Sequence, residues 1–276
     1  MKKINTLILF CLLTMMSFAQ ATKTTTTNKY RLGFKVSPNV SWLASDNSSM
    51  TVGDKSLQFG YGLNFDIFFA DHYAIGTGFN INNTGGKYSY FAQYTGEDLD
   101  AAGTVLTNMK QVGLISRDLR LQYLQIPLTF KMKTDEIGLI TYWGQFGLGL
   151  NMNLKALSAD NIDYLYYQNK NTLAWEKSNR VNSSMSGSKD IKNEVNIFSS
   201  NLIFAAGIEY SLSGNTSILA GLTFQNGFTD ALKGTGVAKD ASTNSPVFDG
   251  GTSNAPETFE LSGLPNYIEL NIGILF

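Results

Sequence analysis

The chain has 276 residues, of which only 16% are charged, and it includes 18 Phe, 13 Tyr and 26 Gly. The charged fraction is below the usual quarter, which favours an exported, β-rich protein. The formal net charge is −1, and the lack of a basic excess argues against nucleic acid as a partner.

The N-terminus has the features of an export signal. Two lysines precede an apolar run over residues 4–18, and small residues follow where a signal peptidase cuts. We therefore predict a secretory signal peptide over residues 1–19, followed by a flexible, Thr-rich polar leader over 20–29. Cys11 is the only cysteine and lies inside the signal. The mature protein then has neither a disulfide framework nor a thiolate site.

From residue 30 onward the chain alternates apolar residues with polar or small ones at a period of two, which predicts strands. The last segment shows this most clearly, with Glu269, Asn271 and Gly273 on its polar face. Its apolar face carries Ile268, Leu270, Ile272, Ile274 and Phe276. The eight segments cover residues 30–42, 57–69, 73–81, 123–132, 140–152, 198–212, 218–228 and 265–276.

The connections between the eight segments alternate between short and long. Tight turns are expected at 70–72, 133–138 and 213–216, and long loops at 43–56, 83–118, 155–195 and 229–264. This pattern predicts one all-β domain over residues 30–276, an eight-stranded antiparallel outer-membrane β-barrel with short periplasmic turns and long extracellular loops. A soluble, lipocalin-like barrel would reverse the two faces, and the periodicity does not distinguish it.

Aromatic residues recur at one end of the apolar face, which favours the membrane alternative. They lie near the tight turns of seven of the eight segments, as an interfacial aromatic girdle would. The seven positions are Tyr30, Phe69, Tyr73, Phe130, Tyr142, Tyr210 and Phe276.

One short motif resembles a known family. Residues 123–128 read Tyr-Leu-Gln-Ile-Pro-Leu, which resembles the Tyr-Leu-x-Ile-Pro-Leu segment of the PorT-family (outer-membrane protein β-barrel) proteins of Bacteroidetes. The Ser-Phe-Ala-Gln signal end and the terminal Gly-Ile-Leu-Phe fit this resemblance, and the last segment also resembles the C-terminal assembly signal of outer-membrane barrels. The resemblance implies an eight-stranded barrel in the cell outer membrane. It also implies, for some members, a part in type IX secretion and gliding.

Charged residues on the polar face are expected to fill the barrel interior as a network of ion pairs and hydrogen bonds. Closure pairs the first strand with the last, which places Arg31 or Lys35 within reach of Glu269. A small polar conduit is the functional alternative. The network positions are Arg31, Lys35, Asp66, Lys131, Glu209 and Glu269.

The sequence offers no catalytic, cofactor or metal site that we would assign. His72 is the only histidine and is expected in a periplasmic turn, the wrong end for outer-leaflet lipid chemistry. The acidic run at 97–100 lacks the spaced oxygen ligands and glycine of a dedicated calcium loop. We therefore expect a protein that is not an enzyme.

Aromatic residues in two of the long loops are candidate contact residues, because exposed Tyr and Trp are common at recognition surfaces. The alternative is that they pack the loops against each other. They are Tyr88, Tyr90 and Tyr94 in one loop, and Tyr164, Tyr166, Tyr167 and Trp175 in another.

The leading functional hypothesis is a non-enzymatic envelope protein that acts through its loops. Its expected partners are outer-membrane lipid, the barrel-assembly machinery that would read the last segment, and envelope or secretion-system proteins. The alternatives are a small-solute pore and an outer-leaflet lipid-modifying enzyme.

Overall fold

The computed structural model describes residues 29–99, 103–180, 183–184, 188–213, 215–248 and 255–276. Within these ranges fourteen strands form one sheet, and the only helical element is the 3₁₀ turn η2 (Lys192–Glu194). The same ranges hold no helix with the length and apolar character needed to cross a membrane. The predicted signal peptide and nearly all of the leader lie outside the described residues.

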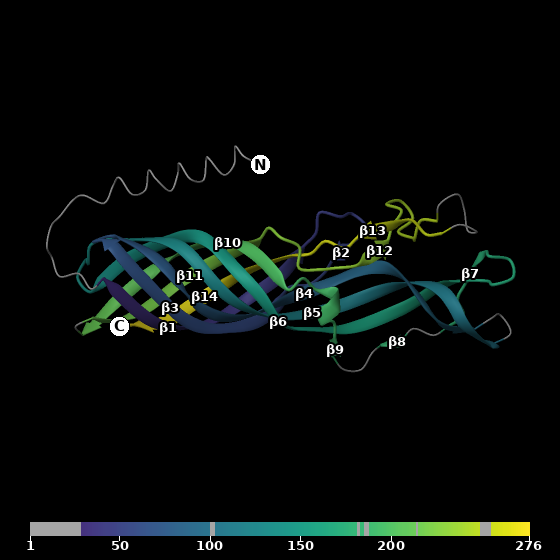
Figure 1. Cartoon of the computed structure of the whole chain (residues 1–276), viewed down its shortest axis with the longest axis horizontal. Coiled ribbons are helices and arrows are strands. Elements are labelled where there is room, and N and C mark those ends of the chain that lie inside the picture. The colour runs from purple at the N-terminus through teal and green to yellow at the C-terminus, as the bar shows by residue number, and fades with distance from the viewer. Residues whose placement is uncertain (1–28, 100–102, 181–182, 185–187, 214, 249–254) are drawn as a thin grey trace.

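Eight long strands close into an antiparallel barrel, as predicted (Figure 1). The hydrogen-bonded order is β4-β3-β1-β14-β11-β10-β6-β5, and pairing of β4 with β5 completes the ring. The eight strands are β1 (Tyr30–Ala44), β3 (Ser56–Ala70), β4 (Tyr73–Leu99), β5 (Val105–Lys133), β6 (Ile140–Gln168), β10 (Phe198–Ser213), β11 (Thr216–Gly227) and β14 (Leu264–Leu275).

The strand register shows how strongly the barrel is staggered. Passing from partner to partner around the ring, a path that starts at Tyr30 returns to β1 at Val40, ten residues further along. A stagger of this size accompanies strands tilted by roughly 35–45° and a lumen narrow enough for side chains to fill. The successive partners are Tyr30, Ile67, Ile75, Phe130, Phe146, Phe204, Phe224, Ile268 and Val40.

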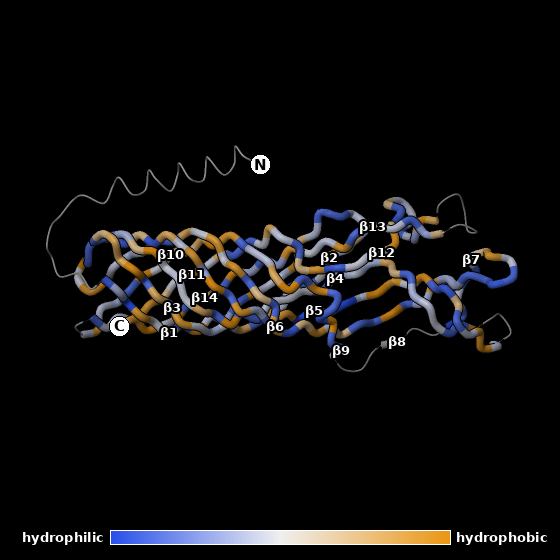
Figure 2. Tube along the Cα trace, in the orientation of Figure 1, coloured by the Kyte–Doolittle hydropathy of each residue, from blue (hydrophilic) through white to orange (hydrophobic). Residues whose placement is uncertain are grey.

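Within the barrel, the apolar face of every strand points outward. Large apolar side chains on it are well exposed, among them Leu57 at 78%, Phe79 at 59% and Leu222 at 59%. Figure 2 shows the resulting alternation of apolar and polar residues along the barrel strands. An apolar outer surface of this kind is stable only in contact with lipid or detergent, because exposing it to water costs free energy. The lipocalin-like alternative, which buries this face, is therefore wrong.

An apolar group of three side chains, Trp143, Leu219 and Leu275, lies inside the barrel at the end that carries the tight turns, which we call the tight-turn end. Gly207 and Gly221 leave room for the indole, because a Cβ on either would come within 3 Å of a Trp143 ring carbon. The lumen is thus packed with apolar atoms at this end.

At the opposite end, which we call the extended end, β4, β5 and β6 run far beyond the other strands (Figure 1). The segment 83–118, predicted as a loop, is therefore largely strand, and in the predicted loop 155–195 strand β6 continues to Gln168. Long strands need their edges covered. On β4 the cover is β2 (Thr51–Val52) and β12 (Thr235–Val237) with β13 (Thr258–Glu260), and on β6 it is β7 (Trp175–Lys177), β8 (Ser183–Ser184) and β9 (Lys189–Asp190).

A second core lies inside the extended end, and all four long connections contribute to it. This upper core contrasts with the polar lumen below it. Its buried members are Leu43, Met50, Tyr88, Tyr90, Ala92, Leu119, Leu121, Tyr123, Ala156, Ile191, Val195, Ala231, Leu232 and Leu261. Because each connection buries apolar side chains in this core, the connections form one folded unit rather than four separate loops.

Candidate functional site

Four charged side chains meet inside the barrel near the tight-turn end. Arg31 Nη1 lies 2.5 Å from Glu209 Oε2, and Lys131 Nζ lies 2.7 Å from the other oxygen of Glu209. The same ammonium lies 2.6 Å from Asp66 Oδ2. These side chains come from β1, β3, β5 and β10, so the cluster ties both sides of the barrel together. Two cations face two carboxylates, and the cluster is neutral as a whole.

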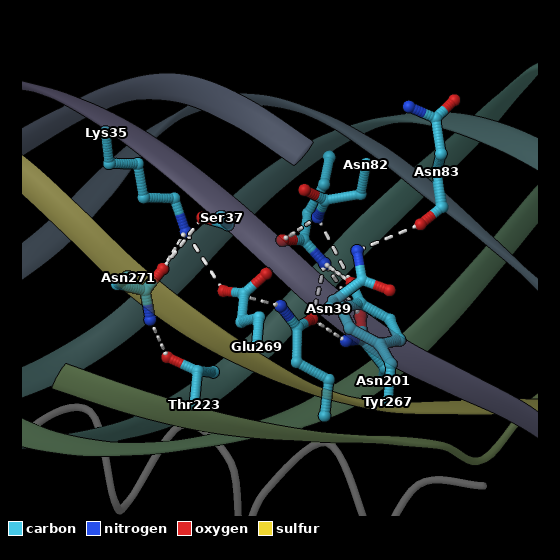
Figure 3. A network of polar contacts seen from close by, with 12 residues as sticks. Lys35, Ser37, Asn39, Asn82, Asn83, Asn201, Thr223, Tyr267, Glu269 and Asn271 are labelled. Atoms are coloured by element: carbon cyan, nitrogen blue, oxygen red, sulfur yellow. Dashed lines mark hydrogen bonds and ion pairs between the residues drawn. The ribbon is translucent and has the colours of Figure 1, made fainter. Parts of the chain in front are cut away.

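A second pair lies further along the lumen (Figure 3). Lys35 Nζ lies 3.1 Å from Glu269 Oε1 and donates to Asn271 Oδ1 at 3.1 Å. Glu269 is fully buried and also accepts a hydrogen bond from Gln225. Of the two partners expected for Glu269, the structure selects Lys35, while Arg31 binds Glu209 instead. All six charged residues expected inside the barrel are thus engaged in ion pairs with one another.

Above the second pair, a group of amides fills the lumen around Gln125. Its Nε2 lies 2.9 Å from Asn151 Oδ1, 2.8 Å from Gln225 Oε1 and 3.2 Å from Asn201 Oδ1. Tyr267 closes the group and accepts a hydrogen bond from Asn82 (Figure 3). The cavity beside this network measures about 40 Å³, which is room for water and not for a solute.

The lumen is therefore occupied along its length. The Trp143 group and the four-charge cluster fill the tight-turn end, the Lys35–Glu269 pair and the amides the middle, and the upper core the extended end. Every charge named above has a partner of opposite sign, as burial requires. The geometry supports a packed polar core and gives no support to the polar conduit considered from sequence.

One buried ion-pair cluster was missed by the sequence analysis. Arg117 on β5 binds Asp160 through two parallel contacts of 2.8 and 2.7 Å, and its Nη1 lies 2.6 Å from Glu194 Oε2. The guanidinium lies beside the stacked rings of Tyr88 and Tyr90, and it donates to Tyr88 Oη at 3.5 Å. The cluster joins β4, β5, β6 and η2, and so fixes the connection after β6 to the sheet.

Burial shapes the acid–base behaviour of this cluster. It raises the pKa of Tyr88 and of Tyr90 above the ordinary 10.0, although the neighbouring Arg117 charge acts in the opposite direction. Burial alone would lower the pKa of Arg117, but the hydrogen bonds to Asp160 and the nearby tyrosines raise it overall. Both tyrosines are therefore neutral, and the arginine is charged, throughout the physiological range.

The aromatic residues proposed as exposed loop contacts need correction. Four of them are buried, with Tyr88 at 2%, Tyr90 at 5%, Tyr167 at 4% and Trp175 at 6% exposure. They lie on strands β4, β6 and β7, where they pack the extended end. The packing alternative is therefore the right one for these four residues.

The other three candidate aromatics are half-buried. Tyr94 and Tyr164 meet edge to face with ring centroids 5.9 Å apart, and Arg180 lies 4.2 Å above the Tyr164 ring. Tyr166 packs on Phe248. These side chains retain some surface at the tip of the extended end, but mainly they hold the tip together.

The two polar features considered for chemistry, His72 and the acidic run at 97–100, lie at opposite ends of the molecule (Figure 1). His72 lies in the turn between β3 and β4, with Nε2 3.6 Å from the exposed carboxylate of Asp135. Asp98 is buried and accepts hydrogen bonds from Gln111 and Ser178, so protein groups already hold its carboxylate, and Asp100 lies outside the described residues. In the part of the chain that the structure describes, His, Cys, Asp and Glu side chains nowhere gather in threes as a metal site would need.

Four of the five residues expected to direct assembly lie on β14 between β1 and β11, and Phe276 directly follows that strand. Their side chains point outward into the region that lipid would occupy. They are Ile268, Leu270, Ile272, Ile274 and Phe276, with exposures between 43 and 57%.

A closed antiparallel barrel with an apolar outside, a polar packed lumen and extensions at one end is a transmembrane β-barrel of the outer-membrane type. The sequence agrees, because residues 18–233 match the family model described as "Outer membrane protein beta-barrel domain". The chain belongs to this family, and its location is the outer membrane. The tight turns then face the periplasm and the extended end is extracellular.

Known structures of the same kind were also found. Neisserial surface protein A (Neisseria) is 9% identical with a TM-score of 0.36, over 90% of this chain and 96% of that chain. Ail, the attachment invasion locus protein of Yersinia pestis, is 11% identical with a TM-score of 0.33, over 90% and 99%. OprG from Pseudomonas aeruginosa is 12% identical with a TM-score of 0.36, over 90% and 95%. A search of curated proteins found no match.

Proposed function

We propose that this is a non-enzymatic outer-membrane protein that works through its extracellular part, in envelope assembly, secretion or surface interaction, as a PorT-like protein would. The observation that carries the proposal is the division of the molecule. The barrel is filled by its own side chains, whereas β4, β5 and β6 continue beyond it as a folded unit with covered edges. Such an extension is not needed to keep a barrel in the membrane.

The tip of this unit is the part best suited to contact a partner. Val105 and Leu173 are 57% and 58% exposed there, although both are apolar and far from the lipid-facing band. Leu173 also has a φ of 58°, a left-handed backbone conformation that costs free energy for a residue with a side chain. Its turn is nevertheless well defined, because Asn169 Oδ1 accepts from the Asn171 amide at 2.9 Å and Leu173 N donates to Asn169 O at 2.8 Å. An exposed apolar residue on such a turn is a suitable anchor for a protein partner.

A shortened hairpin tests the proposal. Ala92 and Gly113 are cross-strand partners, so residues 93–112 can be replaced by an Asn-Gly turn without breaking the register below them. We expect the shortened protein to remain heat-modifiable in gels, and thus folded, but to lose the envelope proteins that crosslink to the full chain in cells. The point variant Leu173→Asp should weaken the same crosslinks, and Thr172→Asp, on the same turn, serves as its control.

Two further measurements address the alternatives on the same preparations. Stable conductance steps of the intact protein in planar bilayers would replace the proposal with a pore. A change in the lipid A profile on expression of the protein would replace it with an enzyme. Crosslinked partners that persist in both the shortened and the Leu173→Asp proteins would show that the tip is not the contact surface.

A further inference from the structure

A row of basic side chains lies on the outer wall of the barrel, separate from the charges of the lumen. Lys87 on β4, Arg120 on β5 and Lys155 on β6 all point outward, and the side chains of Lys87 and Arg120 are 54% and 58% exposed. The barrel charges have each other as partners, whereas these three face the surroundings of the barrel. Their position relative to the membrane therefore decides what they meet.

The strand register makes the three cations neighbours. Lys87 is the cross-strand partner of Asp118, two residues from Arg120 on the same face of β5. Lys155 is the partner of Gln122, two residues from Arg120 in the other direction. Diagonal neighbours of this kind have Cα atoms about 7–8 Å apart. Because the barrel is staggered, cross-strand partners lie progressively further towards the extracellular side on going from β4 through β5 to β6. Each diagonal step of the row moves back towards the membrane by two residues. The two shifts nearly cancel, so the row runs roughly parallel to the membrane plane.

The row lies just beyond the lipid-facing apolar band. Lys155 directly follows Leu154, which is still exposed on that band. Arg120 is four residues beyond Leu124, the last apolar residue that β5 has on its outward face before the row is reached. Four residues of a tilted strand rise roughly 10 Å, which reaches the headgroup layer outside the hydrocarbon core.

Other polar groups extend this surface. Below the row, the amides of Asn83 and Gln122 face outward and bind each other at 3.1 Å. Beside it, Lys55 Nζ lies 5.1 Å from the Trp42 ring, at the outer rim of β1 and β3. A polar, cationic strip thus occupies the outer rim on the β3–β6 side of the barrel.

Two carboxylates compete for these cations without cancelling them. Asp54 lies 3.3 Å from Lys87, and Asp118 lies 3.8 Å from Arg120. The strip therefore has four cations against two anions when Lys55 and Lys155 are included, and the neighbouring Asp190 and Lys192 add one charge of each sign. Exposed pairs of this kind are weak, typically below about 1 kcal/mol, so a phosphate can displace or share them.

We propose that Lys87, Arg120 and Lys155 bind the phosphate groups of phosphorylated lipids in the outer leaflet. The barrel then holds a layer of anionic lipid on its β4–β6 side, below the extracellular unit. Arg and Lys are the side chains that recognise phosphate, and the row sets three of them at headgroup height. This inference is independent of which partner the tip contacts.

Lipid selection by the purified full chain tests the proposal. The protein is reconstituted in nanodiscs of an equimolar mixture of phosphatidylcholine and phosphatidic acid, and lipids that remain bound after detergent extraction are counted by native mass spectrometry. We expect the wild-type chain to retain phosphatidic acid. The variant Lys87→Gln/Arg120→Gln/Lys155→Gln should lose this preference, by about fivefold for each cation and on the order of 100-fold in total.

The control removes the same charge elsewhere. Lys110, Lys170 and Lys177 lie on the distal part of the extracellular unit, and their joint change to Gln should leave the preference unchanged. An equal loss in this control, or no loss in the row variant, would overturn the proposal. So would displacement of phosphatidic acid by equimolar inorganic phosphate, which would assign the row to a soluble anion. If the triple variant is not heat-modifiable, Arg120→Gln alone decides the matter, with an expected fivefold loss.

Discussion

The charged cluster at the tight-turn end gives the sharpest test of the packed lumen. Lys131 is 2% exposed, and its ammonium lies between Asp66 and Glu209 at 2.6 and 2.7 Å. The change Lys131→Met keeps most of the side-chain volume and removes the charge. Glu209 then keeps Arg31, whereas Asp66, which is 4% exposed, loses its ammonium partner.

The expected loss of unfolding free energy comes from the Asp66 carboxylate, which stays buried without its ammonium partner. Removing one partner of a buried ion pair costs about 3–5 kcal/mol, because the remaining charge stays buried without compensation. We take about 3 kcal/mol, the low end, because the small cavity beside the network can admit water. Adding Asp66→Asn removes the stranded charge, so the double variant should regain much of the loss, with a coupling free energy of about 1–3 kcal/mol.

Urea unfolding of the protein in phospholipid vesicles measures these differences. Trp143 lies with its ring 5.3 Å from Lys131 Nζ, so its fluorescence reports on the changed site, and heat modifiability reports on the whole barrel. Lys110→Met, an exposed position outside the barrel, serves as the control and should shift the unfolding free energy by less than about 0.5 kcal/mol.

One result would refute the reasoning. If Lys131→Met costs less than about 1 kcal/mol and Asp66→Asn adds nothing to it, water rather than the ion pairs solvates the lumen charges. The lumen would then be a hydrated space, and the argument for a packed barrel that acts only through its extracellular part would lose its main support.

Three further outcomes are expected. Leu270→Lys, on the lipid face, should lower the unfolding free energy by about 2–4 kcal/mol and reduce folded protein in the outer membrane, while Thr258→Lys on β13 should do neither. Arg117→Met should leave Asp160 buried without its partner and open the extracellular unit. Trypsin added to intact cells should then cleave the variant faster than the wild-type protein, and an unchanged rate would mean that the cluster does not hold the unit. Burial raises the pKa of Tyr88 and Tyr90, so the stability that the two neutral rings contribute is complete below pH 10.0 and declines above it; Tyr88 stays neutral near pH 11, and Tyr88→Phe should then leave the 295 nm ionisation amplitude at pH 11 unchanged.

The sequence identifies the membrane-spanning part well, because lipid imposes a simple rule. Each strand there has one face against hydrocarbon and one against a polar lumen, so apolar and polar residues alternate strictly. The closing contact between the first and last strands also follows, since a spanning sheet cannot leave an edge unpaired. Which charges pair inside the lumen does not follow, because the stagger of the barrel decides it. Arg31 reaches Glu209 across the lumen, 178 residues away, instead of Glu269 on the neighbouring strand.

The sequence predicts loops where the extracellular unit has strands, because these strands do not alternate in the same way. Tyr90 and Phe91 are adjacent on β4 and both buried, one in the upper core and one against Val237 of β12. Strands covered on both faces lose the period of two, and pattern alone cannot separate them from other apolar segments. The strands that cover the outer edges of β4 and β6 are only two or three residues long, too short to recognise from sequence.

One signal of the extended strands is nevertheless present in the sequence. On β4 the apolar residues in the membrane have odd numbers, as Ile75 and Phe79 do, and face lipid. Further along the same strand Tyr88 and Tyr90 have even numbers and face inward, on the side that carries Asn82 lower down. The strand does not turn over between them. Only the solvent outside the barrel has changed from lipid to water.

The neighbouring strand β5 runs from the extracellular side into the membrane, so the same change occurs in the opposite order along its sequence. Leu119 and Leu121 are odd-numbered and buried inside, whereas Ile126 and Leu128 are even-numbered and exposed to lipid. The outer face of a strand is polar where it meets water and apolar where it meets lipid. A strand that passes from water into lipid must therefore carry its apolar residues first on the inner face and then on the outer face. A shift of apolar residues from odd to even positions, without an intervening turn, therefore marks where a barrel strand crosses the membrane surface. The row formed by Lys87, Arg120 and Lys155 lies close to this crossing, at the height where lipid phosphates are expected.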